Sequence, residues 1–255
     1  MSRNFLRSLA GLVALLAGCG TDRTAGGTGV GNPVVPVAFT LRGVSSGTGG
    51  AARSLADTAG TVFRAQVMIA WVQRIRIHLP DGVGCPESGS GGDSCASGET
   101  DRSSGVAYDL ATGQVLSSFS DFALPSGSYR KVEVKLGPPG SKDAAVACLG
   151  DASVCLEGEM VRAGVHRPFR LVLPVDQEIA FESASGIDVL HPGAILSAVL
   201  GLGSWLRGQD IGACLDSGKL PSGTDTLVLD SNYPCGNLEN DVKDRMLHST
   251  GLQGH

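Results

Sequence analysis

Seven cysteines are the residues of this sequence whose chemistry is most readily interpreted. One of them, Cys19, stands alone near the N-terminus. The other six fall into three neighbouring pairs along the chain: Cys85–Cys95, Cys148–Cys155 and Cys214–Cys235. Paired thiols form disulfides or hold zinc, and the absence of any Cys-x-x-Cys pair disfavours zinc. The clustering predicts three local disulfides, although six cysteines allow many other pairings.

Cys19 differs from the others because it ends an export signal. Arg3 and Arg7 supply positive charge, and the short apolar run LAGLVALL follows them. A run of this length is too short to span a bilayer, which takes about 20 residues, but it fits the core of a signal peptide. The run ends in Leu16-Ala17-Gly18-Cys19, which matches the lipobox of bacterial lipoproteins. We therefore expect residues 1–18 to be removed and Cys19 to be acylated, with the lipid bilayer as a partner.

The expected location is the cell envelope. Gly20 rather than aspartate follows Cys19, which by similarity to the sorting rule of well-known lipoproteins favours the outer membrane. An exported chain meets oxidising conditions, in keeping with disulfides that would each contribute about 2–4 kcal/mol. The formal net charge of −5 and the lack of a basic patch argue against nucleic acid as a partner.

A few other patterns could carry chemistry. Gly43-Val44-Ser45-Ser46-Gly47 matches the G-x-S-x-G motif of hydrolases, but glycines and serines follow it rather than a helix. Gly92-Asp93-Ser94 is similar to a serine-hydrolase signature, yet it lies within the loop of the first cysteine pair.

Oxygen ligands for Ca²⁺ could come from Asp143, Asp151 and Glu157. Five histidines show no metal-ligand spacing: His78, His166, His191, His248 and His255. With no Walker, Rossmann or zinc-peptidase motif, the sequence predicts no catalytic residue, no metal site and no cofactor.

The surrounding segments predict a mainly β protein, because short apolar runs alternate with glycine- and proline-rich turns. We expect residues 19–36 to form a flexible tether and residues 37–212 a β-sandwich domain. Residues 213–255 would be a disulfide-linked extension with a short helix at 238–247, capped by Asn237. Long loops are expected at 81–104 and 137–155, where the first two cysteine pairs lie.

The strongest strand signal covers residues 62–79. Val67, Ile69 and Trp71 share one face, and the alternation then shifts so that Ile75 and Ile77 become the buried residues. Such a phase change predicts a β-bulge.

A turn is predicted before the half-buried strand at 129–136. Pro125 presets its own φ, and Gly127 would supply a positive φ for a tight turn. Tyr129 could bury its ring while its hydroxyl reaches a backbone group, as in the tyrosine corner of β-sandwiches. Further along, residues 194–202 fit either a strand or a helix, and their glycines favour a strand followed by one helical turn.

These features follow an order found in a known family. The chain has a strand ending in Arg76-Ile77-His78, a short strand Tyr108-Asp109-Leu110, the turn Leu124-Pro125-Ser126-Gly127-Ser128-Tyr129, and a later Trp205-Leu206 segment. Over about residues 35–212 it resembles the uncharacterised β-sandwich domain of bacterial surface lipoproteins, in which an L-P-x-G-x-Y turn precedes a central strand. The resemblance implies an immunoglobulin-like or transthyretin-like antiparallel β-sandwich with no established activity.

Together these features predict a membrane-anchored envelope lipoprotein that presents a non-enzymatic β-sandwich for binding or structural roles. Its partner would be an envelope protein or a glycan. The alternatives are an exported hydrolase and a dedicated glycan-binding module. Sugar sites often expose tryptophans, but Trp71 and Trp205 lie in apolar runs and are expected in the core.

Overall fold

The computed structural model describes residues 32–45, 53–84, 93–96, 98–116, 119–140, 146–221 and 225–255. These residues belong to one compact unit. The predicted signal, Cys19 and the expected tether up to residue 31 lie outside the described residues. The first strand begins at Val34 rather than Val37, because Val35 already points into the core with Val37. The end of the expected tether is therefore part of a sheet.

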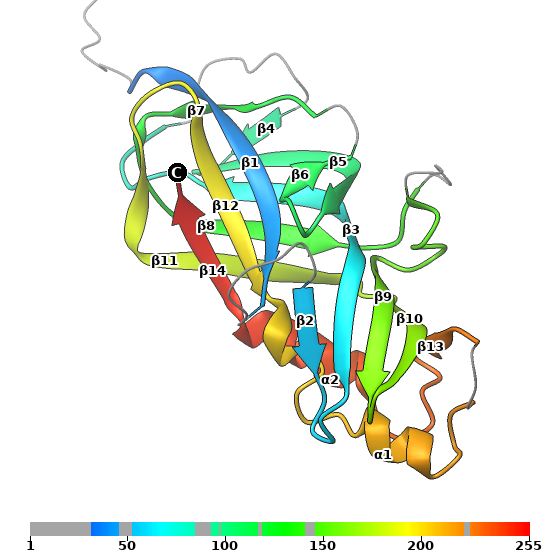
Figure 1. Ribbon diagram of the computed structural model, residues 1–255. Coiled ribbons are helices and arrows are strands. Elements are labelled where there is room, and N and C mark those ends of the chain that lie inside the picture. Colours follow the sequence, from blue (N-terminus) through cyan, green and yellow to red (C-terminus); the bar gives the residue numbers. More distant parts are fainter. Residues whose placement is uncertain are drawn as a thin grey trace, which may run out of the picture. The chain divides into compact units, whose positions relative to one another are not determined.

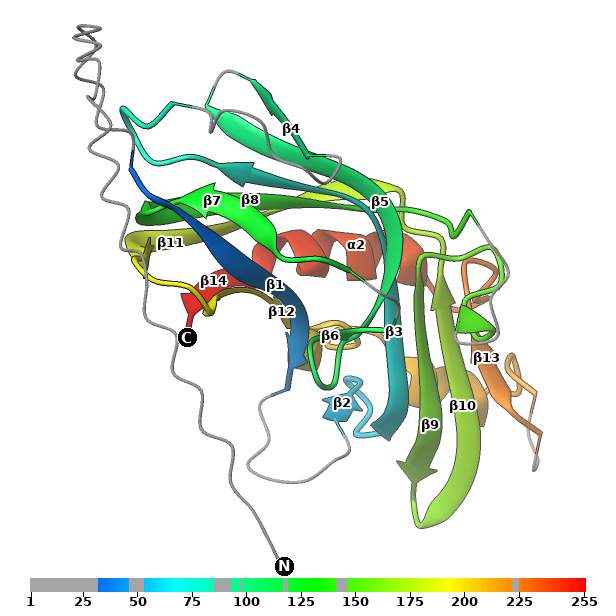
Figure 2. The same ribbon diagram turned by 90° about the horizontal axis from the view of Figure 1, so that it is seen from above.

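The chain is mainly β, and its strands form two sheets (Figure 1; Figure 2). The smaller sheet is four-stranded, in the order β14-β12-β1-β7, and the larger is ten-stranded, with the central path β11-β8-β3-β9-β10-β13. The strands are β1 Val34–Val44, β2 Arg53–Ala56, β3 Val62–His78, β4 Asp93–Ala96, β5 Glu99–Asp109, β6 Gln114–Val115, β7 Phe122–Pro125, β8 Gly127–Leu136, β9 Val154–Arg162, β10 Val165–Leu173, β11 Gln177–Val189, β12 Ala194–Gly201, β13 Leu227–Leu229 and β14 Thr250–Gly254. The helices are a 3₁₀ turn at Leu202–Ser204, α1 at Ile211–Asp216 and α2 at Leu238–His248.

The expected fold class is confirmed, since the chain has two β-sheets and a short C-terminal helix. Most neighbouring strands are antiparallel. Two pairs are parallel instead: β1 runs beside β12 with Val37 opposite Ala194, and β10 runs beside β13 with Phe169 opposite Leu227. Parallel partners need long crossover connections, and here the intervening strands and helices supply them.

Strand β3 contains the predicted bulge. Its register against β5 and β8 shifts between Val72 and Arg74. Ala70 and Val72 are buried in the main core before the shift, and Ile75 and Ile77 are buried in the same core after it. A bulge is required because a strand of period two would otherwise turn its second half out of the core.

The opposite face of β3 packs into a second, smaller apolar cluster. Ile69 and Trp71 lie in it together with Val146 and Leu149 from the segment after β8. Val67 shares this face of β3, as predicted, but it lies outside the cluster and is 38% exposed.

One main core joins the two sheets. Phe39 of β1 and Leu196 of β12 pack in the same cluster as Phe63 of β3 and Phe181 of β11. Each fully buried side chain of this size contributes about 1.5–3 kcal/mol. The two sheets are therefore stabilised together rather than separately.

The C-terminal segment is built into both sheets. β13 pairs with β10, and β14 pairs with β12. Leu238, Val242 and Met246 of α2 are buried, as their helical spacing predicted. The predicted side-chain cap is wrong: Asn237 makes no such hydrogen bond, and only its backbone carbonyl accepts one, from the Asp241 amide at 3.0 Å.

The turn between β7 and β8 contains the predicted tyrosine contact. Tyr129 is fully buried, and its hydroxyl donates to the Pro125 carbonyl oxygen at 2.6 Å. The predicted positive φ at Gly127 is wrong. Glycine is required there for space instead, because a Cβ atom would lie 2.6 Å from Cγ of Pro80.

Candidate functional site

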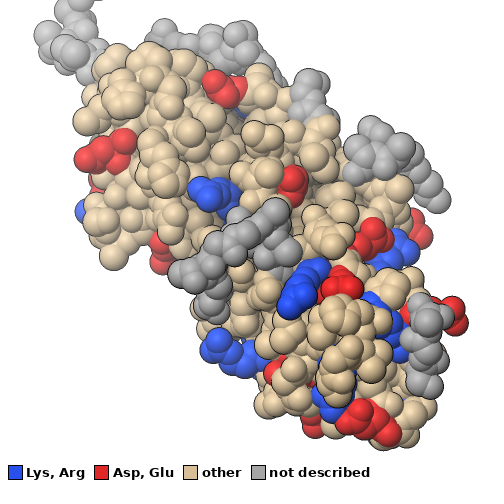
Figure 3. Space-filling model, viewed as in Figure 1, with Lys and Arg blue, Asp and Glu red and all other residues tan. Residues whose placement is uncertain are grey.

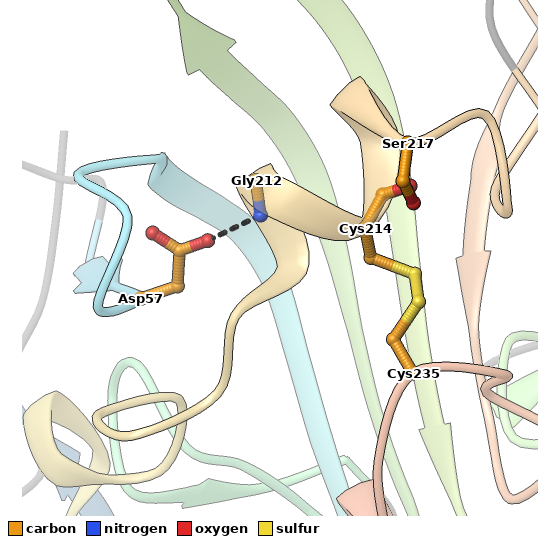
Figure 4. The surroundings of a disulfide bond; sticks show 5 residues. All are labelled: Asp57, Gly212, Cys214, Ser217 and Cys235. Atoms are coloured by element: carbon orange, nitrogen blue, oxygen red, sulfur yellow. Dashed lines mark hydrogen bonds between the residues drawn. A yellow bond between two sulfur atoms is a disulfide. The ribbon is translucent and has the colours of Figure 1, made fainter.

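Cys214 and Cys235 form a disulfide, which confirms the third predicted pair (Figure 4). Their Cα atoms are 5.9 Å apart, and the bond links α1 to the segment before α2. Cys19 and Cys85 lie outside the described residues, as does the side chain of Cys95. The pair Cys85–Cys95 and the acylation of Cys19 stay predictions.

A buried carboxylate lies close to this disulfide. Asp57, in the turn between β2 and β3, accepts hydrogen bonds from the backbone amides of Thr61 and Gly212, each at 2.7 Å. Gly212 is in α1, two residues before Cys214, so Asp57 ties the β2–β3 turn to the helix that carries the disulfide (Figure 4). Both carboxylate oxygens accept backbone hydrogen bonds, which assigns Asp57 a structural role.

The second predicted pair is close but unbonded. Cys148 and Cys155 are separate thiols, so the predicted disulfide is not formed in this structure. Their Sγ atoms and a carboxylate oxygen of Glu157 lie within 4.8 Å of one another. Cys155 is buried in β9, and Cys148 is half-buried in the turn that precedes it.

An ionic cluster covers the face of the large sheet that points away from the main core. It comprises Arg74, Arg76, His78, Glu99, Asp101, Lys131, Glu133 and Glu178. These side chains come from β3, β5, β8 and β11, which are neighbours in the sheet. The register sets acids beside bases, since Arg76 of β3 is opposite Asp101 of β5 on one side and Glu133 of β8 on the other.

Arg76 is at the centre of the ionic cluster. Its Nε atom is 3.3 Å from Glu99 and 3.6 Å from Asp101. Its Nη1 atom is 3.1 Å from Glu133 and 3.3 Å from Glu178. Burial opposes the charge of Arg76, but the surrounding carboxylates, Glu178 first, outweigh it and raise the pKa of the guanidinium. The centre of the cluster is therefore a fixed cation.

His78 ends the cluster at the last residue of β3. Its Nδ1 atom is 3.2 Å from Glu99, and its Nε2 atom is 3.3 Å from Glu133. Glu133 also accepts from Lys131, at 2.7 Å. Burial raises the pKa of Glu133, but hydrogen bonds from Lys131 and His78 lower it further, to about 2. Glu133 is therefore ionised at neutral pH and holds the Lys131 and His78 side chains in place.

A groove opens where the ionic cluster ends, and we call it the polar groove. It encloses about 590 Å³ and lies at the adjoining ends of β3, β5 and β8. Its charged lining consists of His78, Asp81, Glu99, Arg130 and Lys131, and its only aromatic ring is the imidazole. Arg130 is exposed and forms no ion pair with any described residue. The volume falls in the range of small-ligand sites, about 300–1,000 Å³.

Among the described residues, no serine hydroxyl is hydrogen bonded to a histidine. In the groove, His78 lies between two carboxylates, Glu99 and Glu133. Gly43 and Val44 of the hydrolase-like motif end β1, and Ser45 follows them. Ser46 and Gly47 lie outside the described residues, as do the side chains of Asp93 and Ser94.

The histidines and acidic residues considered as metal ligands have other partners. His166 Nδ1 is 3.0 Å from Glu159, whereas His191 is exposed with Nδ1 3.3 Å from its neighbour's carbonyl oxygen. Glu157, one of the three candidate Ca²⁺ ligands, is paired with Arg170 at 3.3 Å. Asp143 lies outside the described residues.

Both tryptophans are in the interior, as predicted. Trp71 is 7% exposed and Trp205 is 0% exposed. Neither therefore offers a flat ring on which a sugar could stack.

Comparisons with known proteins give no relative for this fold and groove. A scan of protein-family models finds no match, and searches of the curated proteins and of the solved structures find none. Within the described ranges, no helix is both long and apolar enough to cross a membrane. On its own structure the chain is a two-sheet β protein with a charged groove, and its relation to the lipoprotein sandwich domain stays a prediction.

Proposed function

We propose that this chain is a lipid-anchored protein of the bacterial cell envelope, held in the outer membrane by acylated Cys19. Its two-sheet domain is a non-enzymatic binding module for an envelope glycan that bears a carboxylate or phosphate group. The observation that carries the proposal is Arg130, which is exposed in the polar groove without an ion pair among the described residues.

The surroundings of Arg130 favour an anionic ligand. A guanidinium pairs with a carboxylate or phosphate through two parallel hydrogen bonds. Lys131 lines the same groove and is already positioned by Glu133, so its ammonium adds hydrogen-bond donors in a fixed place. Binding then needs little rearrangement, which lowers its entropic cost.

The size and lining of the groove favour a glycan over a protein. A stable protein interface buries about 800 Å² on each partner, far more surface than one such groove supplies. The lining offers charge and hydrogen bonds but no indole or phenol, so a neutral sugar that depends on ring stacking would bind poorly. On the face drawn in Figure 3, acidic and basic side chains lie interspersed.

Calorimetry with three probes tests the ligand class: a uronic-acid disaccharide, a sugar phosphate and a neutral disaccharide. We expect at least one anionic probe to bind and the neutral probe not to bind. Arg130→Ala should weaken anionic binding by about tenfold or more, because a charge-assisted pair is lost. Arg207→Ala is the matched control, since Arg207 is an exposed arginine outside the groove. Unchanged binding by Arg130→Ala, or equal binding of the neutral probe, contradicts the proposal.

Membrane fractionation tests the anchor separately. Cys19→Ser should move the protein from the membrane fraction to the soluble fraction, because the acyl chains are no longer attached. Cys148→Ser is the control and should stay with the membrane. Identical fractionation of the two variants would show that Cys19 is not the anchor.

A further inference from the structure

The function proposed for the polar groove assigns no role to the two neighbouring thiols, Cys148 and Cys155. Cys155 is fully buried in β9, and Cys148 is half-buried in the turn before that strand. Their Sγ atoms lie within 4.8 Å of each other. Side-chain rotation can bring sulfurs at this separation to bonding distance, provided that the Cβ atoms are close.

Arg170 of β10 organises the pair. It is opposite Glu157 in the register, with its Nε atom 3.3 Å from that carboxylate. Its Nη2 atom donates to the Cys148 carbonyl oxygen, and its guanidinium also donates to the Cys155 sulfur. One cation therefore contacts both halves of the pair.

The two thiols differ in proton affinity. A hydrogen bond from the Cys148 thiol lowers the pKa of Cys155, and the Arg170 guanidinium lowers it further in spite of burial. The same hydrogen bond raises the pKa of Cys148. When the pair loses one proton, the negative charge is therefore favoured on the buried sulfur beside Arg170.

Arg170 also argues against a metal ion at this place. A cation between the sulfurs and Glu157 would have to displace the guanidinium that already contacts Glu157 and Cys155. Structural zinc takes four protein ligands, and the described residues supply Cys148, Cys155 and Glu157 alone. Oxidation of the pair requires no such displacement.

A bond between the thiols would fasten a turn to the sheet. Val146 and Leu149 of the turn pack on Ile69 and Trp71 of β3 in the second apolar cluster. This cluster is small and is separate from the main core. A covalent link at Cys148 would therefore hold the turn where few apolar contacts do.

We propose that Cys148 and Cys155 are a redox-active pair that a disulfide-bearing thiol oxidant converts to a disulfide, which fastens the turn 146–153 over Trp71. Starting from the dithiol, Cys155 first releases its proton to solvent, aided by Arg170. The more exposed Cys148 then transfers its own proton to Cys155, and the Cys148 thiolate attacks the oxidant RSSR, forming a mixed disulfide and releasing RS⁻. Cys155 releases this second proton and attacks the Cys148 sulfur, releasing the second RS⁻. In total the protein gives up two protons and two electrons, and the two RS⁻ take up two protons to become two thiols.

Oxidised glutathione, followed by alkylation and peptide mass mapping of the full chain, tests the chemistry. The wild type should give Cys148 linked to Cys155 with no glutathione retained. Cys155→Ala should accumulate a stable mixed disulfide on Cys148, because the resolving thiol is missing. Cys148→Ser should take up no glutathione at Cys155, because that sulfur is buried. The Cys214–Cys235 bond is the internal reference, and Cys155→Ser replaces Cys155→Ala if the latter does not melt like the wild type.

Any one of three outcomes would overturn the assignment. The first is that both thiols of the wild type are alkylated after glutathione treatment. The second is that glutathione stays on wild-type Cys148, and the third is that zinc binds stoichiometrically and protects both thiols. The structural half of the proposal is measured by hydrogen exchange: amides of residues 146–153 should exchange about tenfold more slowly in the oxidised protein. Equal exchange in the two redox states would show that the bond fastens nothing. Neither measurement depends on the groove or on the membrane anchor.

Discussion

Two buried tyrosines differ in what their hydroxyl groups do. The Tyr129 hydroxyl donates to the Pro125 carbonyl oxygen at 2.6 Å. The Tyr108 hydroxyl has no hydrogen-bond partner within the described part of the chain, although both side chains are 0% exposed. Burial raises the pKa of each phenol, so both stay protonated at neutral pH. The structure therefore supplies a matched pair for measuring one hydrogen bond.

Tyr129→Phe should lower the free energy of unfolding by about 1–2 kcal/mol, because the buried Pro125 carbonyl loses this donor. Tyr108→Phe is the control and should change it by less than about 0.5 kcal/mol, since no hydrogen bond is lost. Urea unfolding at neutral pH measures both. Equal losses in the two variants would mean that the Tyr129 bond adds nothing to the stability of the turn.

Among the strands, only part of the ionic cluster could be predicted. The sequence predicted the strands that carry Arg76, His78 and Glu133, but not that these side chains share one face of a sheet. Their partners Glu99 and Asp101 were assigned to a loop, because the first half of β5 has no apolar alternation. That segment is a strand because it pairs with the long β3. Tertiary pairing of this kind overrides weak local preference, and no local pattern records it.

The same cause explains other missed elements. β2 lies in a segment expected as a loop, and it pairs with β3 with Leu55 opposite Phe63. The short α1 was not predicted because six residues give too little periodicity, and it is fixed by the disulfide and by Asp57. By contrast, α2 and the strand β12 were predicted because their apolar spacing is complete within each segment. The sequence did not identify Arg130 as a candidate binding residue, because sequence alone does not show whether an arginine is ion-paired.

The ionic cluster should make stability depend on acid. The folded pKa of Glu133, about 2, lies below its ordinary value of 4.5. Its contribution is therefore fully present above about pH 4.5 and is lost as the pH falls toward 2. Since such surface pairs are screened by solvent, we expect Glu133→Gln to reduce the stability lost between neutral pH and about pH 3 by about 1 kcal/mol.

Urea unfolding at the two pH values measures this difference. Asp188→Asn is the control, because Asp188 is exposed on β11 opposite Ser128 and forms no ion pair with a described residue. The control should lose as much stability in acid as the wild type. If Glu133→Gln loses as much as well, the cluster does not stabilise the sheet through this carboxylate.

At the scale of the whole molecule, the sequence predicted a domain boundary at residue 212, but strands after this residue pair with strands before it. β13 joins the large sheet and β14 joins the small one. The disulfide and the Asp57–Gly212 hydrogen bond tie the same segment to the rest. This pairing was not predictable from local patterns, because β13 is only three residues long and β14 pairs with a strand about 50 residues earlier.

Because the C-terminal segment is paired with both sheets, we expect a single unfolding transition. Trp205 lies in the main core, so its fluorescence should change at the same urea concentration as far-ultraviolet circular dichroism, which reports all strands and helices. Replacing both Cys214 and Cys235 by alanine opens a loop with a sequence separation of 21, and should shift the whole transition by about 3 kcal/mol. The two signals should still coincide in this variant, because β13 and β14 stay paired with the two sheets. An early loss of circular dichroism that tryptophan fluorescence does not follow would instead mark residues 213–255 as a detachable extension, as the sequence suggested.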